Sequence, residues 1–274
     1  MSLLEAIVLG IVQGLTEFLP ISSTAHLRIV PAFVGWPDPG AAFTAVTQLG
    51  TVAAVLVYFR EDLARIARAW LRSLRAPRAR RSLDARLGWY IVLGTAPIAV
   101  LGLAFEEPIE TVARNLYLIS ATLIGLGLLL LLAERLGTRL RGMESLGARD
   151  GVVVGFAQAL ALVPGVSRSG ATITAGLFLG LDRPTAARFS FLLSVPAVVL
   201  SGVFQLFSIL DGTEGRETGL VALVVATVLA FVVGYASIAF LLRFLATHST
   251  GVFVVYRVAL GLLVLGLALG GVIR

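Results

Sequence analysis

Long apolar segments alternate with short polar connections along the chain. Six segments hold about 18 or more mostly apolar residues, which is the length a helix needs to cross the hydrocarbon core of a bilayer. They cover approximately Ala42–Phe59, Gly88–Phe105, Asn115–Ala133, Phe189–Leu210, Thr218–Leu242 and Gly251–Ile273. Arg257 is the only charged residue within them. The pattern predicts an all-α polytopic membrane protein.

Two further apolar regions are too short or too interrupted to span a bilayer. The first, Ala6–Thr16, is followed by Glu17 and Pro20, and the second, Gly151–Val166, breaks at Pro164. Broken apolar segments of this size are typical of re-entrant helical hairpins, whose non-helical backbone is buried in protein. We expect such hairpins over about residues 6–40 and 151–181.

Several stretches in the first half of the sequence resemble stretches in the second half. Three stretches recur, namely Gly10–Leu15 as Gly155–Leu160, Pro20–Ser23 as Pro164–Ser167, and Tyr117–Arg135 as Tyr256–Arg274. Each half then holds one re-entrant hairpin and three spans. Because three is odd, the second half enters the membrane from the opposite side, which makes an inverted repeat. We expect the halves to cover residues 1–142 and 147–274 and to form one integral membrane domain.

Composition narrows the class further. Of 274 residues, 58% are hydrophobic, only 14% are charged, and none is cysteine. Soluble domains carry about 25% charged residues, so a soluble enzyme and a disordered chain are both excluded. A disulfide scaffold and a cysteine-based metal site are excluded as well.

The basic residues predict the orientation of the chain. All 22 are arginine, and the net charge is +6. Sixteen lie on one predicted side, nine of them in the loop 60–86, and four lie on the other side at Arg28, Arg114, Arg216 and Arg274. The positive-inside rule therefore places the loop 60–86 inside, as an amphipathic segment near anionic lipid, and both termini outside. No module that combines aromatic and basic residues is present, so no nucleic acid partner is expected.

A first polar cluster follows the first apolar segment. Gln13 and Glu17 share a helix face, and Pro20 ends that helix. The hydroxyl residues Ser22, Ser23 and Thr24 can cap a new helix, and His26 lies on the same face of it as Ser23. A helix N-terminus suits a phosphate, and a serine beside a histidine suits an activated nucleophile. The alternative is that Glu17 lies at the membrane interface, that the serines only cap a helix, and that His26 bonds to a backbone carbonyl.

A second cluster stands at the corresponding place in the other half. Arg168 interrupts an uncharged stretch of 31 residues, 151–181, and its planar fork matches phosphate oxygens. The flanking residues offer hydroxyls and backbone amides at another helix start, and they are Ser167, Ser169, Gly170 and Thr172. Gln158 repeats Gln13 and is a candidate for the same site. Here the alternative is an arginine that reaches the membrane interface or pairs with Glu17 for structure alone.

These residues resemble a known family. Gln13–His26 and Pro164–Thr172 are similar to the two signature motifs of the bacterial undecaprenyl-pyrophosphate phosphatases of the bacitracin-resistance type. The second motif matches at every defined position. The stretch Ala187–Pro196, the chain length and the order of spans agree as well. The acidic pair of the first motif begins here with Gln13 in place of glutamate, and the family pattern accepts either residue at this position.

The resemblance implies hydrolysis of a long polyprenyl diphosphate to the monophosphate and inorganic phosphate, which recycles the lipid carrier of cell-wall synthesis. It also implies a divalent cation, Mg²⁺ or Ca²⁺, and a site at the outer face of the bacterial plasma membrane. The expected partners are the lipid substrate and membrane lipid, with a homodimer as a further candidate assembly. Gln13 weakens the expectation that two carboxylates hold the metal.

The resulting hypothesis gives each residue a role. Arg168 and the two helix N-termini hold the diphosphate, Glu17 with Gln13 holds the metal, and Ser23 attacks with His26 as the base. Two alternatives stay open within this scheme, His26 as the nucleophile or as the activator of a water molecule. A transporter or flippase of a polyprenyl phosphate or another anion is the alternative function, because inverted repeats with broken helices are common in transporters. The histidine-based class of lipid phosphatases fits less well, since the only histidine after Arg168 is His248.

Overall fold

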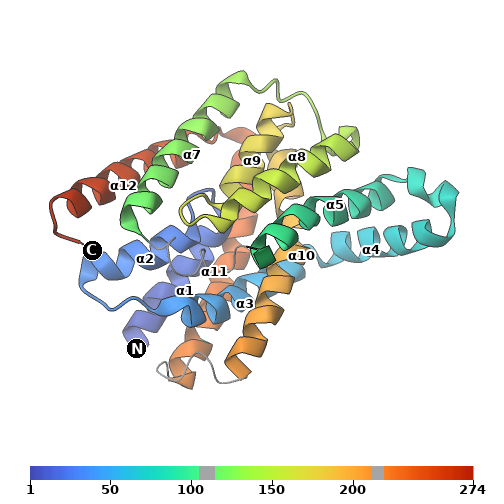
Figure 1. Cartoon of the computed structure of the whole chain (residues 1–274). Coiled ribbons are helices and arrows are strands. Elements are labelled where there is room, and N and C mark those ends of the chain that lie inside the picture. The colour runs from blue at the N-terminus through green and yellow to red at the C-terminus, as the bar shows by residue number, and fades with distance from the viewer. Residues whose placement is uncertain (105–114, 211–218, 274) are drawn as a thin grey trace.

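The computed structural model describes residues 1–104, 115–210 and 219–273, and the regular elements in these ranges are helices (Figure 1). The long helices in chain order are α1 Leu3–Phe18, α2 Ser23–Val34, α3 Gly40–Tyr58, α4 Arg60–Arg75, α5 Leu83–Ala104, α7 Leu116–Leu136, α8 Ala148–Ala159, α9 Arg168–Phe178, α10 Arg183–Leu210, α11 Leu220–Thr247 and α12 Gly251–Leu269. Three short 3₁₀ turns connect them, η1 Pro77–Arg81, η2 Met143–Ser145 and η3 Leu160–Leu162.

The apolar pattern predicted the membrane helices correctly. Five described helices are long and apolar enough to cross a bilayer, namely α5, α7, α10, α11 and α12. A sixth span results if α3 and α4, which are bent by 74° relative to each other, count as one. The all-α polytopic class is therefore confirmed.

The predicted orientation rests partly on charges outside the described residues. These are Arg114, Arg216 and Arg274. The orientation and the division into halves 1–142 and 147–274 stay predictions.

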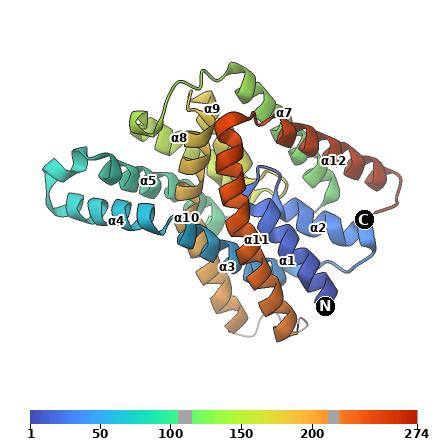
Figure 2. The same ribbon diagram turned by 180° about the vertical axis from the view of Figure 1, so that it is seen from behind.

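Much of the arginine-rich connection 60–86 is an amphipathic helix. On α4, Ile66 and Ser73 are buried, whereas the helix begins and ends with exposed arginines. Trp70 packs edge-on against Trp89 of α5, with ring centroids 5.8 Å apart. In both views α4 and α5 lie side by side and extend away from the other helices (Figures 1 and 2). Burial of one face against α5 explains why so polar a segment is helical.

Both predicted helix breaks are present, whereas re-entry into the membrane stays a prediction. One break separates α1 from α2 at Ser22 and the other separates η3 from α9 at Ser167, and both serines have positive φ, 75° and 68°. Gly10 of α1 packs against the backbone of Ala226 on α11, and Gly155 of α8 packs against Gly94 on α5. A Cβ at either glycine would collide with that backbone, so the glycines set how closely each hairpin approaches its neighbouring span. The close packing holds both hairpins inside the bundle.

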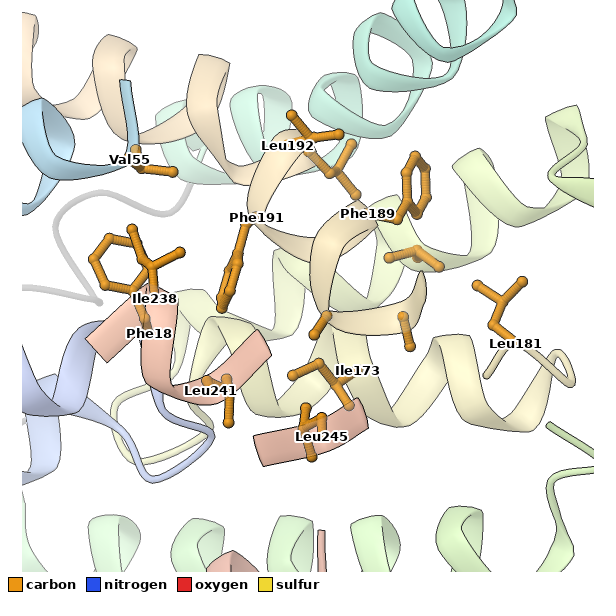
Figure 3. Packing of buried hydrophobic residues seen from close by; sticks show 14 of the residues in the cluster. Phe18, Val55, Ile173, Leu181, Phe189, Phe191, Leu192, Ile238, Leu241 and Leu245 are labelled. Atoms are coloured by element: carbon orange, nitrogen blue, oxygen red, sulfur yellow. The ribbon is translucent and has the colours of Figure 1, made fainter. Parts of the chain in front are cut away.

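A large apolar cluster lies beside the two breaks. It includes Phe18 at the end of α1, Ile173 of α9, Phe191 of α10 and Leu241 of α11 (Figure 3). The rings of Phe18 and Phe191 meet edge to face, with centroids 5.5 Å apart. Because close-packed interiors resist displacement, this cluster gives the ends of α1 and α9 a rigid support.

Candidate active site

The two polar clusters predicted from the sequence meet in one pocket of about 60 Å³. The pocket is lined by Gln13, Glu17, Ser22, Ser23, Thr24, Thr44, Gln48, Ala161, Ser167 and Arg168. Residues separated by some 150 positions along the chain therefore share one polar space. Its lining comes mainly from the end of α1 and the starts of α2 and α9.

Ser23 and Glu17 form the closest contact in the pocket. The Ser23 hydroxyl donates a hydrogen bond of 2.6 Å to Oε2 of Glu17. Gln13, one turn earlier on α1, donates its amide to the same oxygen at 3.1 Å. Short hydrogen bonds to a carboxylate are charge-assisted and stronger than those between neutral groups. The break after α1 thus folds the first residue of α2 back onto the last turn of α1, with the hydroxyl on a potential base.

Arg168 supplies the positive charge of the pocket. It is the first residue of α9, and its Nε and Nη1 are buried with no hydrogen-bond partner among the described residues. Burying guanidinium donors without acceptors is costly, and a bidentate oxyanion is the ligand that matches their geometry. Arg168 and Glu17 line the same pocket. The pocket therefore holds an anion-binding group next to a polarised hydroxyl.

The structure does not bring His26 to Ser23. The Nδ1 of His26 is 2.7 Å from the carbonyl oxygen of Ser22, and its Nε2 is 2.6 Å from the hydroxyl of Tyr256 on α12. A carbonyl only accepts, so Nδ1 carries the hydrogen, and in the neutral ring Nε2 accepts from Tyr256. The expectation that His26 takes the proton of Ser23 is not met in this geometry, where Glu17 contacts Ser23 instead. A catalytic role for His26 stays a prediction.

Several predicted hydroxyl residues connect the two breaks. Thr24 accepts a bond from the amide of Gly165 at 3.4 Å, and Ser169 donates to the carbonyl of Leu19 at 3.0 Å. Ser167 caps α9, since its hydroxyl accepts from the amide of Gly170 at 3.1 Å. These bonds hold the N-termini of α2 and α9 on the same pocket.

The remaining predicted residues differ in their relation to the pocket. Ser22 lines it, but its hydroxyl lies 3.1 Å from that of Thr24 and does not cap α2. Thr172 is buried and donates to the carbonyl of Arg168 at 2.7 Å, and it is not part of the lining. Gln158 donates to Gly94 of α5 at 3.4 Å and is also outside the lining. The structure therefore does not bring Gln158 to its repeat mate Gln13.

Sequence reasoning missed three contributors. Thr44 and Gln48 of α3 line the pocket. They are four positions apart in an apolar helix, a spacing that places both on one face and could have revealed them. Tyr256 holds His26, and no local pattern could have indicated a partner 230 positions away.

Arg257 is held by backbone groups and forms no ion pair with an acidic side chain of the described residues. Its guanidinium donates to five backbone carbonyls. They belong to Pro20 in the first break, to Gly165 and Val166 in the second, and to Thr122 and Leu123 of α7. The side chain is fully buried. A break in a helix leaves backbone carbonyls without the amide donors of the next turn. The buried guanidinium of Arg257 donates to such carbonyls in both breaks.

Replacing Arg257 by methionine should therefore destabilise the fold. Three break carbonyls lose a buried donor, and each such loss costs about 1–3 kcal/mol. We expect the free energy of unfolding in detergent to fall by about 3 kcal/mol or more, measured by denaturant titration. The matched control is Arg243→Met, since Arg243 is exposed on α11. Equal stability of the two variants would contradict this role of Arg257.

The pocket offers limited but suitable oxygen ligands for a cation. Within the described residues no group of three or more His, Cys, Asp or Glu side chains could hold a metal ion. Oε1 of Gln13 is buried with no hydrogen-bond partner in the described parts of the chain, and it lies next to the carboxylate of Glu17. Mg²⁺ commonly uses one or two protein oxygens and completes its shell with water and substrate phosphates. Gln13 and Glu17 fit that pattern.

Comparison with known proteins identifies the family of the chain. The family model described as bacitracin resistance protein BacA matches residues 6–263. A protein of Chlorobium limicola named undecaprenyl-diphosphatase is 54% identical over 268 residues, covering 95% of each chain. Proteins of the same name from Nocardioides sp. (55% identity, 98% of each chain) and Thermobifida fusca (54% identity, 100% of this chain and 92% of the relative) are equally similar. The chain belongs to the bacitracin resistance protein BacA family.

Proposed function

We propose that this protein is an integral membrane undecaprenyl-diphosphatase, which hydrolyses undecaprenyl diphosphate to undecaprenyl phosphate and inorganic phosphate. The observation that carries the proposal is a serine hydroxyl 2.6 Å from a carboxylate, in a pocket that also holds an arginine with unpartnered donors. Nucleophile, base and anion-binding group together are what phosphoryl transfer requires. The family and the names of the relatives support the same reaction.

The chemistry begins at Ser23. Its hydroxyl already donates to Glu17, so the carboxylate can accept the proton as the oxygen attacks the terminal phosphorus. The new bond joins the serine oxygen to phosphorus, and the bond to the bridging oxygen breaks. Undecaprenyl phosphate leaves with that oxygen and takes the proton from Glu17, which becomes a carboxylate again. Glu17 then accepts a proton from the water that attacks the phosphoserine, the bond between phosphorus and the serine oxygen breaks, Glu17 returns the proton to Ser23, and inorganic phosphate leaves.

Arg168 and the helix starts bind the diphosphate. The fork of Arg168 can engage two phosphoryl oxygens, and the first residues of α2 and α9 line the same pocket. Phosphoryl transfer depends largely on positioning and on stabilising charge, so these groups supply most of the catalytic effect.

A divalent cation, Mg²⁺ or Ca²⁺, belongs to the proposal. Glu17 and Gln13 are the residues that would hold it, and the ion would neutralise charge on the diphosphate. With Gln13 in place of a second carboxylate, substrate oxygens become more important as ligands.

The location is also proposed. The positive-inside pattern places the arginine-rich segment 60–86 in the cytoplasm of a bacterium. We place the protein in the plasma membrane with its pocket open to the outer face, where it recycles the lipid carrier of cell-wall synthesis. Membrane lipid surrounds the exposed apolar faces, and self-association stays a prediction.

Phosphate release tests the proposed function directly. Purified protein in detergent should release one inorganic phosphate per undecaprenyl diphosphate with Mg²⁺ or Ca²⁺, and release should fall at least about tenfold with a chelator. Free phosphate is measured colorimetrically, and the lipid product by mass spectrometry. The control is Ser145→Ala, an exposed serine in η2 whose hydroxyl only contacts Gly142. Absence of release with every divalent ion would contradict the proposal and favour lipid transport.

A further inference from the structure

A relay of two hydrogen bonds connects α12 to the backbone beside Ser23. The hydroxyl of Tyr256 lies 2.6 Å from Nε2 of His26, and the rings of the two residues stack with centroids 5.6 Å apart. Nδ1 of His26 then lies 2.7 Å from the carbonyl oxygen of Ser22. Both nitrogens of the His26 imidazole are therefore engaged. Nε2 contacts Tyr256 of α12, and Nδ1 contacts Ser22 in the break between α1 and α2.

The far end of the relay is a strained position. Ser22 has φ 75° and ψ 101°, a conformation that L residues other than glycine rarely adopt. Its side chain makes no capping bond to α2. Such a conformation persists only where surrounding contacts hold it, and the bond from His26 to the Ser22 carbonyl is one of those contacts. The next residue is Ser23, so the peptide unit that His26 holds also carries the nucleophile.

We propose that Tyr256 is a positioning residue of the active site, which acts through His26 and the Ser22 carbonyl to set the direction of the Ser23 hydroxyl. The inference rests on the proposed function, since it assigns Ser23 as the nucleophile. Tyr256 itself is outside the pocket lining. Its effect is therefore on geometry and not on substrate contact.

The chain contains a matched control for this tyrosine. Tyr117 on α7 is the repeat mate of Tyr256, and the two side chains are similarly exposed, 48% and 43%. The hydroxyl of Tyr117 donates to the backbone carbonyl of Ala268 at 3.2 Å, away from the pocket. Tyr117→Phe and Tyr256→Phe thus remove the same group from related helices, and only the second touches the relay.

The kinetic prediction separates positioning from binding. Tyr256→Phe should lower kcat for undecaprenyl diphosphate about tenfold, because a misdirected Ser23 hydroxyl slows the attack, while KM changes less than about twofold because Tyr256 does not line the pocket. Tyr117→Phe should leave both constants unchanged. The melting temperatures of the two variants should match, which excludes a general loss of folded protein. Equal kcat values for the two variants would overturn the proposal.

A second readout does not depend on phosphatase activity. The chain has no cysteine, so Ser23→Cys introduces a single thiol. We expect its alkylation rate with N-ethylmaleimide in detergent to change about threefold or more when Tyr256→Phe is added, because hydrogen bonds restrict the break. Adding Tyr117→Phe should leave the rate unchanged. Equal rates in all three cysteine proteins would overturn the proposal.

The two readouts keep the two claims apart. If the wild-type protein releases no phosphate, the proposed function fails, and the alkylation rates alone decide whether Tyr256 positions residue 23. If the wild-type protein is active, the proposal requires both the loss of kcat and the change in alkylation rate.

Discussion

Arg168→Lys is expected to lower kcat/KM for undecaprenyl diphosphate by about two orders of magnitude or more. The loss of one preorganised donor to a developing charge typically costs about a hundredfold or more. Lysine keeps the charge but presents a single ammonium in place of a planar fork, so it cannot reproduce two parallel bonds to phosphoryl oxygens. Phosphate release at several substrate concentrations measures the change.

A matched substitution tests whether a change of arginine to lysine outside the pocket lowers activity as well. Arg188→Lys makes the same change on α10, at an exposed arginine that pairs with Asp62 outside the pocket. That variant should retain nearly full activity, because surface ion pairs contribute little and lysine can replace arginine there. Near-normal turnover of Arg168→Lys would remove Arg168 from the phosphate site.

Ser23→Ala is expected to have the largest effect of any single change. If the serine oxygen forms the intermediate, its removal should reduce kcat by at least about a thousandfold, as removal of a nucleophile does in other enzymes. Rapid quenching of the wild-type reaction with substrate labelled at the terminal phosphate should trap phosphoserine, which peptide mapping locates at residue 23. Ser23→Ala should give no labelled peptide.

The same experiment decides between the two candidate nucleophiles. A stable phosphoryl adduct on His26, with Ser23→Ala still turning over, would contradict the serine mechanism. The observed contacts favour serine, because the Ser23 hydroxyl already meets Glu17, whereas both nitrogens of His26 are engaged with Ser22 and Tyr256. A phosphorylated His26 would require the imidazole to leave both partners first.

Ser23 and His26 also show what the spacing of residues along a helix can predict and what it cannot. Their spacing of three residues placed them on one helical face, and it led to the expectation that they form a nucleophile–base pair. In the structure the ring of His26 turns to the backbone one turn earlier and to α12. Helical spacing limits which residues can meet, but the rotamer that a side chain adopts depends on partners from other helices.

The sequence by itself determined the membrane helices, the positions of both breaks and most of the pocket lining. These features follow from properties that act along the chain, namely the length of apolar segments, the position of prolines and the cost of placing Glu17 and Arg168 among apolar residues. Even the pocket residues that were missed, Thr44 and Gln48, follow a local helical spacing.

Only the tertiary structure decided which groups touch. The bond from Ser23 to Glu17, the hold of Tyr256 on His26 and the five carbonyls around Arg257 each depend on how a chain break folds or how separate helices pack. Such contacts arise because every buried donor and acceptor must find a partner, and several arrangements of the same helices could satisfy that demand. Close packing, including the glycine contacts of α1 and α8, selects one of them.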